Sequence, residues 1–444
     1  MTGPPTPRPI STKQARIATL ARQMDGTPLR TVAHHMDVEW LREAFRRTRK
    51  VGAVGIDGVT AEDYATNLEG NLESLLNRAK SWMYQAPPVR RVHIPKGGRG
   101  DKTRPIGIPT LEDKVLQRGM KMLLEPICEQ LFYDFSYGFR PRRSAHDALE
   151  AIHDGLWKLG GGWVLDADIR GFFDAIDHGH LREMLRHRVV DGVVTRLIGK
   201  WLRAGVMEEG VVTHPESGSP QGGVISLLLA NLYLHEVLDS WWAETVLPRM
   251  RGRAFMVRYA DDFVMVFELQ ADAERVHAVL PQRLERFGLT LHPDKPRLIP
   301  FRHPDDRRSP APGTFDFVGF TLLWRRSRKG TWTLGRKTSS ARFSRALRAL
   351  NEWMSRARHV PLRKQATPLA AKLNGHFNYY GTQRNSKSIS RFHYEARRLW
   401  RRWLCRRSQR ATLNWTRHAK ILERYPPPKP HIRARPQQLR LANL

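Results

Sequence analysis

Two adjacent carboxylates near the middle of the chain lie between two apolar runs. Asp261 and Asp262 complete a Tyr-Ala-Asp-Asp sequence, with apolar residues at 255–257 before it and at 263–267 after it. Both runs have the composition of β-strands, so the sequence predicts a hairpin with its carboxylates at or near the turn. Aspartate is also a common turn residue because its side chain bonds the local backbone, so this pair alone does not identify a site.

A third carboxylate, Asp168, lies near the end of another predicted strand. Residues 163–169 alternate between an apolar set and a set that contains two aspartates. In a strand, one face would carry Trp163, Leu165, Ala167 and Ile169, and the other would carry Val164, Asp166 and Asp168. Helices can cover the apolar face, which leaves Asp168 on an open face near the strand's end.

Neighbouring strands that carry Asp168 and the Asp261–Asp262 pair would gather three carboxylates in one place. Three like charges are costly together unless a cation compensates them. Hard oxygen ligands suit Mg²⁺, which also binds substrate phosphates. Two such ions roughly 4 Å apart can activate an attacking hydroxyl and stabilise a leaving pyrophosphate. The arrangement is a candidate nucleotidyl-transfer site.

Ordered motifs along most of the chain resemble those of reverse transcriptases. The Tyr-Ala-Asp-Asp at 259–262 and the segment 168–178, Asp-Ile-Arg-Gly-Phe-Phe-Asp-Ala-Ile-Asp-His, are similar to the palm motifs of these enzymes. The closest resemblance is to bacterial group II intron-encoded reverse transcriptase/maturases, from about Val51 to about Pro430. It implies an α+β right-hand polymerase, with an antiparallel sheet and helices in the fingers and palm and an all-helical thumb/maturase domain.

The resemblance also assigns the catalytic positions. Asp168, Asp261 and Asp262 match the family's metal ligands and inherit the role of holding two Mg²⁺ ions. Three other acids do not match metal positions and are interpreted as solvated or locally hydrogen-bonded: Asp166, Asp174 and Asp177.

Further matches imply contacts with the incoming nucleotide. Two predicted strands, 92–96 and 104–109, flank a Gly-rich turn, as in the family block whose Lys and Arg contact a dNTP. Arg99 and Lys102 are alternatives to the matched cations, and a generic solvated hairpin stays open. Phe173 matches the family ring that excludes a 2′-hydroxyl, but it could equally be an ordinary core Phe. The implied dNTP-binding residues are Lys96, Arg104, Phe173 and Gln221.

Other matches imply a proton donor and contacts with template, primer or RNA. Lys295 matches a possible general acid for the leaving pyrophosphate, although lone lysines are usually solvated. Segment 315–320 is similar to the hairpin that grips the primer, and 373–381 to the maturase region, whose aromatic residues suit both RNA stacking and thumb packing. The expected contacts are Arg140, Arg142, Arg143, Gly222, Tyr259, Gly319, Tyr379 and Tyr380.

The charge of the chain is very uneven. The net charge is +32, and residues 321–444 contain 31 Lys and Arg against three acids. A solvated surface normally mixes both signs, so a polyanionic partner is the economical explanation. Nucleic acid fits best, with a membrane surface as the alternative because Trp and Tyr are interleaved with Arg. Binding of nucleic acid should weaken strongly with salt through counterion release.

A chain of 444 residues exceeds a typical single domain. The expected parts are a basic helical extension, fingers and palm, a helical thumb/maturase domain and a basic Pro-rich tail, at 1–50, 51–325, 326–425 and 426–444. An almost wholly apolar run from Gly222 to about Trp242 predicts a buried helix. The family usually has Ser-Pro where this chain has Ser226-Leu227, so we expect this helix to begin one turn earlier. In the thumb, apolar residues at helical spacing predict a core with arginines facing outward.

Cysteine and hydropathy content indicate a cytosolic protein, and the family resemblance implies a bacterial one. Only Cys128 and Cys405 are present, which excludes a disulfide framework and a Cys-based zinc site. No apolar run approaches the roughly 18 residues of a membrane span, and the start lacks a signal-peptide core. The Cys pairs of the family's endonuclease domain are missing, so we expect DNA cleavage to come from elsewhere if the protein serves a mobile intron.

The leading hypothesis is an RNA-directed DNA polymerase that also binds its parent intron RNA, promotes its splicing and supports intron mobility. Its expected partners are template and intron RNA, a DNA primer or target, and dNTPs, without a membrane; the oligomeric state stays open. Two alternatives are an RNA-binding maturase with vestigial polymerase activity and a domesticated enzyme of phage defence or DNA repair.

Overall fold

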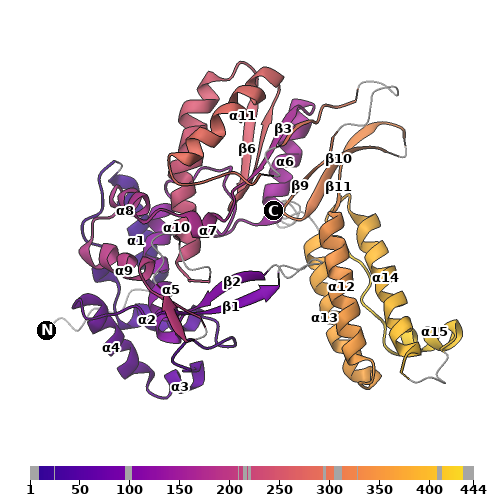
Figure 1. Cartoon of the computed structure of the whole chain (residues 1–444), viewed down its shortest axis with the longest axis horizontal. Helices are drawn as coiled ribbons and strands as arrows, with labels where there is room; N and C mark the ends of the chain where they lie inside the picture. The colour runs from indigo at the N-terminus through magenta and orange to yellow at the C-terminus, as the bar shows by residue number, and fades with distance from the viewer. Residues whose placement is uncertain are drawn as a thin grey trace. The chain divides into compact units, whose positions relative to one another are not determined.

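The chain forms two compact units, Met1–Leu298 and Ile299–Leu444. The computed structural model describes residues 10–24, 26–95, 103–208, 210–213, 218, 222–293, 297–304, 313–327, 329–407 and 413–433. Helices and antiparallel strands mix in the first unit, and helices dominate the second (Figure 1). This mixture confirms the predicted α+β class. The finer boundaries expected at residues 50, 325 and 425 stay predictions.

The first unit opens with helices that pack around α5. The expected basic helical extension is two helices, because Gly26 takes a left-handed φ of +76° and Pro28 follows it. Asp37 starts the second helix by accepting the backbone N–H of Trp40 at 2.8 Å. The helices of this region are α1 (Ile10–Gln23), η1 (Ala33–His35), α2 (Val38–Arg47), α3 (Ala61–Ala65), α4 (Leu68–Lys80) and α5 (Leu111–Cys128).

A four-stranded sheet of order β2-β1-β4-β5 lies beside these helices. Its members are β1 (Val89–Pro95), β2 (Thr103–Ile108), β4 (Val206–Glu208) and β5 (Val211–Thr213). Strands β1 and β2 are antiparallel, with Pro95 opposite Thr103, so the predicted hairpin around the Gly-rich turn is confirmed.

A second four-stranded sheet, of order β6-β7-β3-β8, carries the predicted carboxylates. Helix α6 packs against β6, and α11 packs against β3 and β7 (Figure 1). The strands are β3 (Trp163–Asp168), β6 (Ala254–Tyr259), β7 (Asp262–Phe267) and β8 (Arg297–Pro300). The other helices around it are α6 (Ala145–Leu159), α7 (Phe172–Ala175), α8 (His178–Arg186), α9 (Gly192–Leu202) and α11 (Gln270–Glu285).

The predicted buried helix is α10 (Ser226–Leu234), which continues through π-helical and 3₁₀ turns η2 (His235–Asp239), η3 (Trp241–Val246) and η4 (Leu247–Arg249). Eight of the nine residues of α10 are buried. The expected extra turn upstream is wrong, since α10 begins at Ser226. The N–H of Val224 instead donates to the Gln117 side chain at 2.7 Å, which fixes a non-helical entry.

The second unit joins a small sheet to a helical bundle. Its sheet has the order β11-β10-β9, built from β9 (Phe315–Phe317), β10 (Phe320–Arg326) and β11 (Trp332–Thr338). Its helices are α12 (Ser340–Ala357), α13 (Leu362–Tyr380), α14 (Ser386–Cys405) and α15 (Trp415–Arg424). The predicted apolar stripes form its core, which includes Leu350, Met354, Ile389, Phe392 and Ala396. Within the described ranges, no helix has the length and apolar character needed to cross a membrane.

Candidate active site

The Tyr-Ala-Asp-Asp sequence forms the tip of the hairpin between β6 and β7. Tyr259 pairs with Asp262, so Ala260 and Asp261 are the two residues of the turn. Ala260 has a φ of +58°, a left-handed backbone conformation that residues other than Gly rarely adopt. Such strain persists only where the surroundings hold the backbone, and it is common at functional sites.

Strand β3 brings the third carboxylate to this hairpin. β3 and β7 are antiparallel, and Asp168 lies directly opposite Asp262. Directly paired residues place their Cβ atoms about 5 Å apart on the same face of a sheet. All three carboxylates, Asp168, Asp261 and Asp262, are half-buried. The fold therefore collects from two distant segments the acids that the sequence singled out.

The backbone of Asp168 is itself anchored. Its carbonyl accepts the N–H of His292 at 2.9 Å, and the N–H of Arg170 donates to Thr290 at 2.9 Å. Among the acids interpreted as structural, Asp177 caps α8 by accepting the N–H of His180 at 2.8 Å. Asp166 is buried on β3.

A buried ion pair lies beneath the hairpin turn. The side chains of Arg258 and Asp239 are both 0% exposed, and Nε of Arg258 donates to Oδ1 of Asp239 at 2.7 Å. Arg258 also donates from Nη1 to the carbonyl oxygen of Ala260 at 3.1 Å and to Oδ1 of Asn231 at 3.2 Å. Burial raises the pKa of the Asp239 carboxyl, and the guanidinium of Arg258 opposes that rise. One arginine thus joins the π-helical segment η2 to the strained residue beside the carboxylates.

A loop from the predicted template block supports the same turn from the other side. The N–H of Arg258 donates to Phe135, and the N–H of Tyr137 donates to Arg258, both at 2.9 Å. Gly138 is buried against the turn, where an added Cβ would lie 2.2 Å from the backbone nitrogen of Ala260. Its carbonyl accepts Nδ2 of Asn231 at 2.7 Å. Only a glycine fits at this contact.

Arg140, an expected template contact, has its guanidinium held by partners inside the protein. Its side chain is 4% exposed and pairs with Glu129 at 3.0 Å. Nη1 donates to the carbonyls of Tyr133 and Ser136 at 2.7 and 2.8 Å, so Arg140 holds this loop together. Arg142 is exposed, and Arg143 is half-buried with its guanidinium on Asp134.

Two glycines of the predicted Pro-Gln-Gly loop touch the neighbouring elements. Gly218 donates its N–H to Ile176 at 2.8 Å, and an added Cβ there would lie 3.0 Å from the carbonyl of Phe173. At Gly222, which has a φ of +119°, a Cβ would lie 2.2 Å from the carbonyl of Gly107 on β2. Gly218 therefore lies against α7, which carries half-buried Phe173, and Gly222 lies against β2, the strand that contains Arg104. Of the other expected nucleotide contacts and the possible general acid, Lys96, Gln221 and Lys295 lie outside the described residues.

A buried polar network holds the far end of this loop. Gln117 accepts the N–H of Val224 and donates to Oδ2 of Asp113 at 2.9 Å. Oδ1 of Asp113 accepts the Tyr84 hydroxyl at 2.6 Å and the Trp201 indole at 2.7 Å. Burial raises the pKa of Asp113 to about 6 even though all three donors oppose that rise.

The second unit gathers the expected primer and RNA residues on one side of α13. The hydroxyl of Tyr379 donates to the carbonyl of Val318 at 2.8 Å, at the turn between β9 and β10. Gly319 has a φ of +85°, and an added Cβ would lie 3.1 Å from the Tyr380 hydroxyl and 3.5 Å from Cγ of Arg342. Burial raises the pKa of Tyr380. Turn, tyrosines and arginine thus form one continuous surface.

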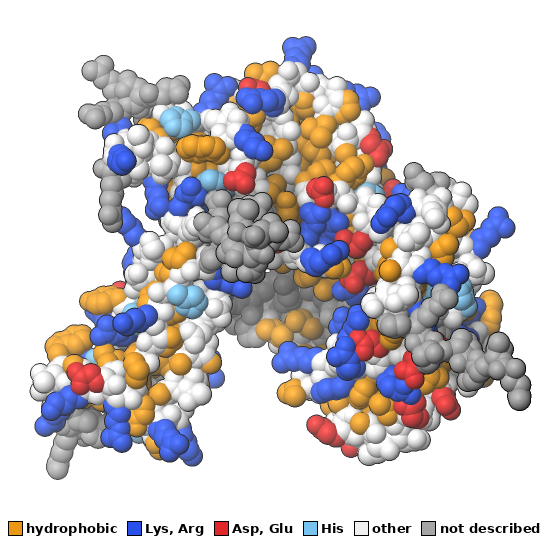
Figure 2. All heavy atoms as spheres, turned by 180° about the vertical axis from the view of Figure 1, so that it is seen from behind, with side chains coloured by type: hydrophobic (Ala, Val, Ile, Leu, Met, Phe, Trp, Pro, Cys, Tyr) orange, Lys and Arg blue, Asp and Glu red, His pale blue; other side chains and the backbone are white. Residues whose placement is uncertain are grey.

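Arginines cover the outer faces of the helices in this unit, as the sequence predicts. Figure 2 shows many Lys and Arg side chains and few acidic ones over them. The exposed arginines of α12 and α14 are Arg342, Arg345, Arg348, Arg356, Arg391, Arg397, Arg398 and Arg402. A surface of this kind binds a polyanion.

The donor set at the hairpin fits a hard divalent cation. It consists of three carboxylates, which suit Mg²⁺ better than a soft or nitrogen-preferring metal. Another group of potential ligands among the described residues, Glu150, His153 and Asp154, lies on one helix, α6, and is separate from these acids.

Residues that sequence reasoning missed are the supports of the site. Arg258, Asp239, Asn231, Asp113 and Gln117 are buried polar side chains. Arg258 directly precedes the Tyr-Ala-Asp-Asp sequence within a strand, which is the one signal that could have pointed to it.

Comparison with known proteins gives a consistent result. The family model described as reverse transcriptase (RNA-dependent DNA polymerase) matches residues 94–322. Protein YkfC from Escherichia coli K12 is 34% identical over 358 residues, which cover 72% of this chain and 90% of YkfC. The group II intron-encoded protein LtrA from Lactococcus lactis is 35% identical over 232 residues, which cover 52% of this chain and 34% of LtrA. This chain therefore matches about a third of LtrA's length.

A solved telomerase from Candida albicans, in complex with a fragment of telomeric RNA, aligns with 78% of this chain and 63% of its own. The TM-score is 0.41 at 14% sequence identity, which is too low to carry a structural argument.

Proposed function

The chain belongs to the reverse transcriptase family and is an RNA-directed DNA polymerase of the group II intron type, and on that premise we propose how its residues act. Asp168, Asp261 and Asp262 are the catalytic carboxylates and hold two Mg²⁺ ions. The single observation that carries this proposal is the register of β3 and β7, which sets Asp168 opposite Asp262 beside the turn that contains Asp261.

Reverse transcriptases generally use divalent metal ions. When bound, the ions lower the pKa of the primer 3′-hydroxyl and neutralise charge on the leaving pyrophosphate. The protein's own contribution is positioning. Arg258 holds the carbonyl of Ala260, and paired strands fix Asp168 against Asp262, so the carboxylates do not have to reorganise during the reaction.

We assign the dNTP to the space between β2, α7 and the Pro-Gln-Gly loop. The contact of Gly222 with Gly107 and the contact of Gly218 with Phe173 support this assignment. Phe173 acts against a 2′-hydroxyl, and Lys96, Arg104 and Gln221 contact the triphosphate and base. Lys295 is the candidate donor of a proton to pyrophosphate.

The second unit binds RNA and primer in this proposal. Tyr379 and Tyr380 place aromatic rings at the turn that contains Gly319, beside Arg342, one of the exposed arginines of α12. Arginine and aromatic side chains together bind unpaired nucleic acid by phosphate contacts and base stacking. By similarity to LtrA, the bound RNA is a group II intron, whose splicing and mobility the protein supports.

Primer extension tests the catalytic carboxylates. A DNA primer annealed to an RNA template is extended by one nucleotide with Mg²⁺, using the wild type, Asp168→Asn and Asp177→Asn. Asp168→Asn should lower the rate of single-nucleotide extension to below about one thousandth of the wild-type rate, as expected when preorganised charge stabilisation is lost. Asp177→Asn is the matched control, since asparagine is an equally good helix cap.

Binding of a group II intron transcript is measured on the same proteins by filter retention. All three should bind it equally well and more tightly than an unrelated RNA of the same length. Extension by Asp168→Asn at the wild-type rate contradicts the catalytic assignment. Intron binding without extension by the wild type would indicate a maturase with a vestigial polymerase.

A further inference from the structure

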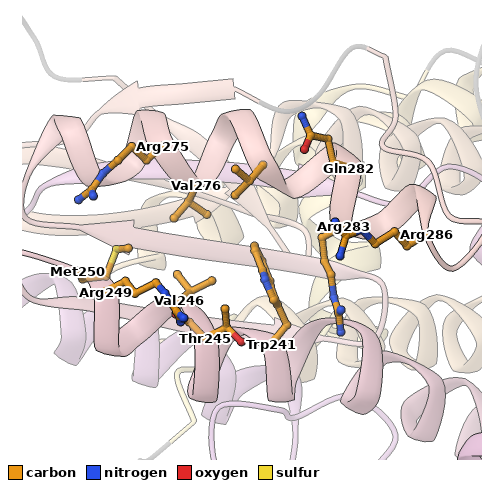
Figure 3. Close-up of a pocket in the computed structure, with 11 residues that line it drawn as sticks. Trp241, Thr245, Val246, Arg249, Met250, Arg275, Val276, Gln282, Arg283 and Arg286 are labelled. Carbon is orange, nitrogen blue, oxygen red and sulfur yellow. The ribbon is translucent and has the colours of Figure 1, made fainter.

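A groove of about 510 Å³ lies between α11 and the segment formed by η3 and η4 (Figure 3). Its apolar wall includes Trp241, Val246 and Val276, and Trp241 projects into the space between the two helical segments (Figure 3). None of its lining residues belongs to the polymerase site. Its volume is typical of pockets that bind small ligands or single nucleotides.

The polar side chains of this groove are strongly cationic. Four arginines line it, Arg249, Arg275, Arg283 and Arg286, and no acid does so within the described part of the chain. Burial lowers the pKa of Arg283, and the neighbouring charge of Arg286 lowers it further. Cations of the groove therefore repel one another, and an anion would relieve that repulsion.

Two of the arginines are fixed and two are available. Arg283 donates to the carbonyls of Val237 and Glu236 at 2.9 and 3.1 Å, and Arg275 pairs with Asp272. Arg249 and Arg286 are exposed and form no ion pair with any described residue; the one printed bond of Arg249 runs from Nη1 to the carbonyl of Thr245, one helical turn back, and leaves its other N–H groups to solvent. The fixed pair shapes the groove, and the available pair can bind phosphates.

We infer that this groove binds one unpaired nucleotide of an RNA strand, with its base against Trp241 and the adjoining phosphates on Arg249 and Arg286. The inference rests on the proposed RNA partner and adds a binding site apart from the polymerase centre. Base stacking on an aromatic ring beside arginines is the usual chemistry of single-strand recognition. An acidic peptide would match the charge but would leave the indole face unused, so RNA fits the groove better.

The test uses the full-length protein and a 12-nucleotide oligouridylate with 4-thiouridine at its centre. After irradiation, cross-linked peptides are mapped by mass spectrometry. The wild type should form cross-links within 241–250 or 275–286. In the double variant R249A/R286A, these cross-links should fall roughly 25-fold at 0.1 M salt. Each lost single-strand phosphate contact removes about 0.7 from the slope of log K against log salt, so two contacts lower K about 25-fold at 0.1 M relative to 1 M salt.

The control R30A/R186A removes the same number of arginine charges at two exposed positions outside the groove. It should keep the cross-links at their wild-type level. An abasic 12-mer should compete for the groove less well than the oligouridylate, since it lacks the stacking base. A poly-glutamate 12-mer should not compete.

Absence of groove cross-links in the wild type, or their persistence in R249A/R286A, overturns the inference. Equal competition by the abasic strand would rule out the base contact. Stronger competition by poly-glutamate than by the oligouridylate would show that the groove binds an acidic peptide and not RNA. Primer extension is measured in parallel and should be unchanged in both double variants. Failure of extension in the wild type would count against the polymerase assignment alone, because the cross-links do not depend on it.

Discussion

The Arg258–Asp239 pair should separate stability from catalysis. Replacing Arg258 with Met leaves the carboxyl of Asp239 buried without its partner, and losing one member of such a pair costs about 3–5 kcal/mol. The double variant Arg258→Met/Asp239→Leu removes both charges, and apolar pairs of similar volume are often as stable as the ion pair they replace. Urea unfolding should therefore show a large loss for the single variant and near recovery for the double variant.

Catalysis should not recover with stability. Both variants lack the charged hydrogen bond from Arg258 to the carbonyl of Ala260, which spans 3.1 Å. A hydrogen bond of this type contributes about 1.5–3 kcal/mol. If it holds the turn in its reactive conformation, kcat for single-nucleotide extension should fall about 10- to 150-fold. The KM for dNTP should change little, because Arg258 is fully buried and does not reach the nucleotide.

A surface pair just beyond the ends of β6 and β7 that lie away from the turn provides the control. Arg253 pairs with Glu268 at 3.0 Å, but its side chain is 64% exposed. Exposed pairs contribute less than about 1 kcal/mol, so Arg253→Met should leave both stability and kcat near wild type. A double variant Arg258→Met/Asp239→Leu with restored stability and wild-type kcat would refute the positioning role.

Three further predictions concern the loop, the network behind it and the second unit. Gly222→Ala should lower extension about tenfold or more, because its Cβ would clash with the Gly107 carbonyl, whereas Gly58→Ala, also at positive φ but in open space, should not. Burial raises the pKa of Asp113 to about 6, so the protonated carboxyl stabilises the folded state fully below pH 3.8. This stabilisation is lost as the pH rises to about 6, and urea titrations of Asp113→Asn should lack that loss. The pH dependence of His376 has the opposite sign, because burial lowers its pKa to about 4. The free energy of unfolding should fall by about 3 kcal/mol as the pH drops from 6.5 to 4, and His376→Phe should lack that fall.

Local patterns in the sequence predicted the elements that carry the carboxylates. Alternating residues at 163–169 and the apolar runs around Asp261 and Asp262 predict strands at these positions, and the structure adds the register that pairs Asp168 with Asp262. The hairpin of β1 and β2 and the apolar core stripes of the second unit were predicted for the same reason. These features depend on residues close together in the chain.

The supports of the site could not be predicted in this way. The family resemblance implied a template contact for Arg140, but Glu129 and two backbone carbonyls bind its guanidinium inside the protein. Asp239 lies 19 residues before Arg258, and no periodicity links the two. The start of α10 depends on Gln117, 107 residues away from Val224. Partners of buried polar groups are set by tertiary packing, which one sequence does not reveal.

The central claim is that Asp168, Asp261 and Asp262 together hold a pair of divalent ions. Electron paramagnetic resonance with Mn²⁺ in place of Mg²⁺ tests it directly, on the protein bound to a primer–template and a non-hydrolysable dNTP. The wild type should show two Mn²⁺ ions with the spin coupling expected at roughly 4 Å, and Asp168→Asn should lose that coupling. Coupling that persists in Asp168→Asn, or two uncoupled ions in the wild type, would contradict the shared site.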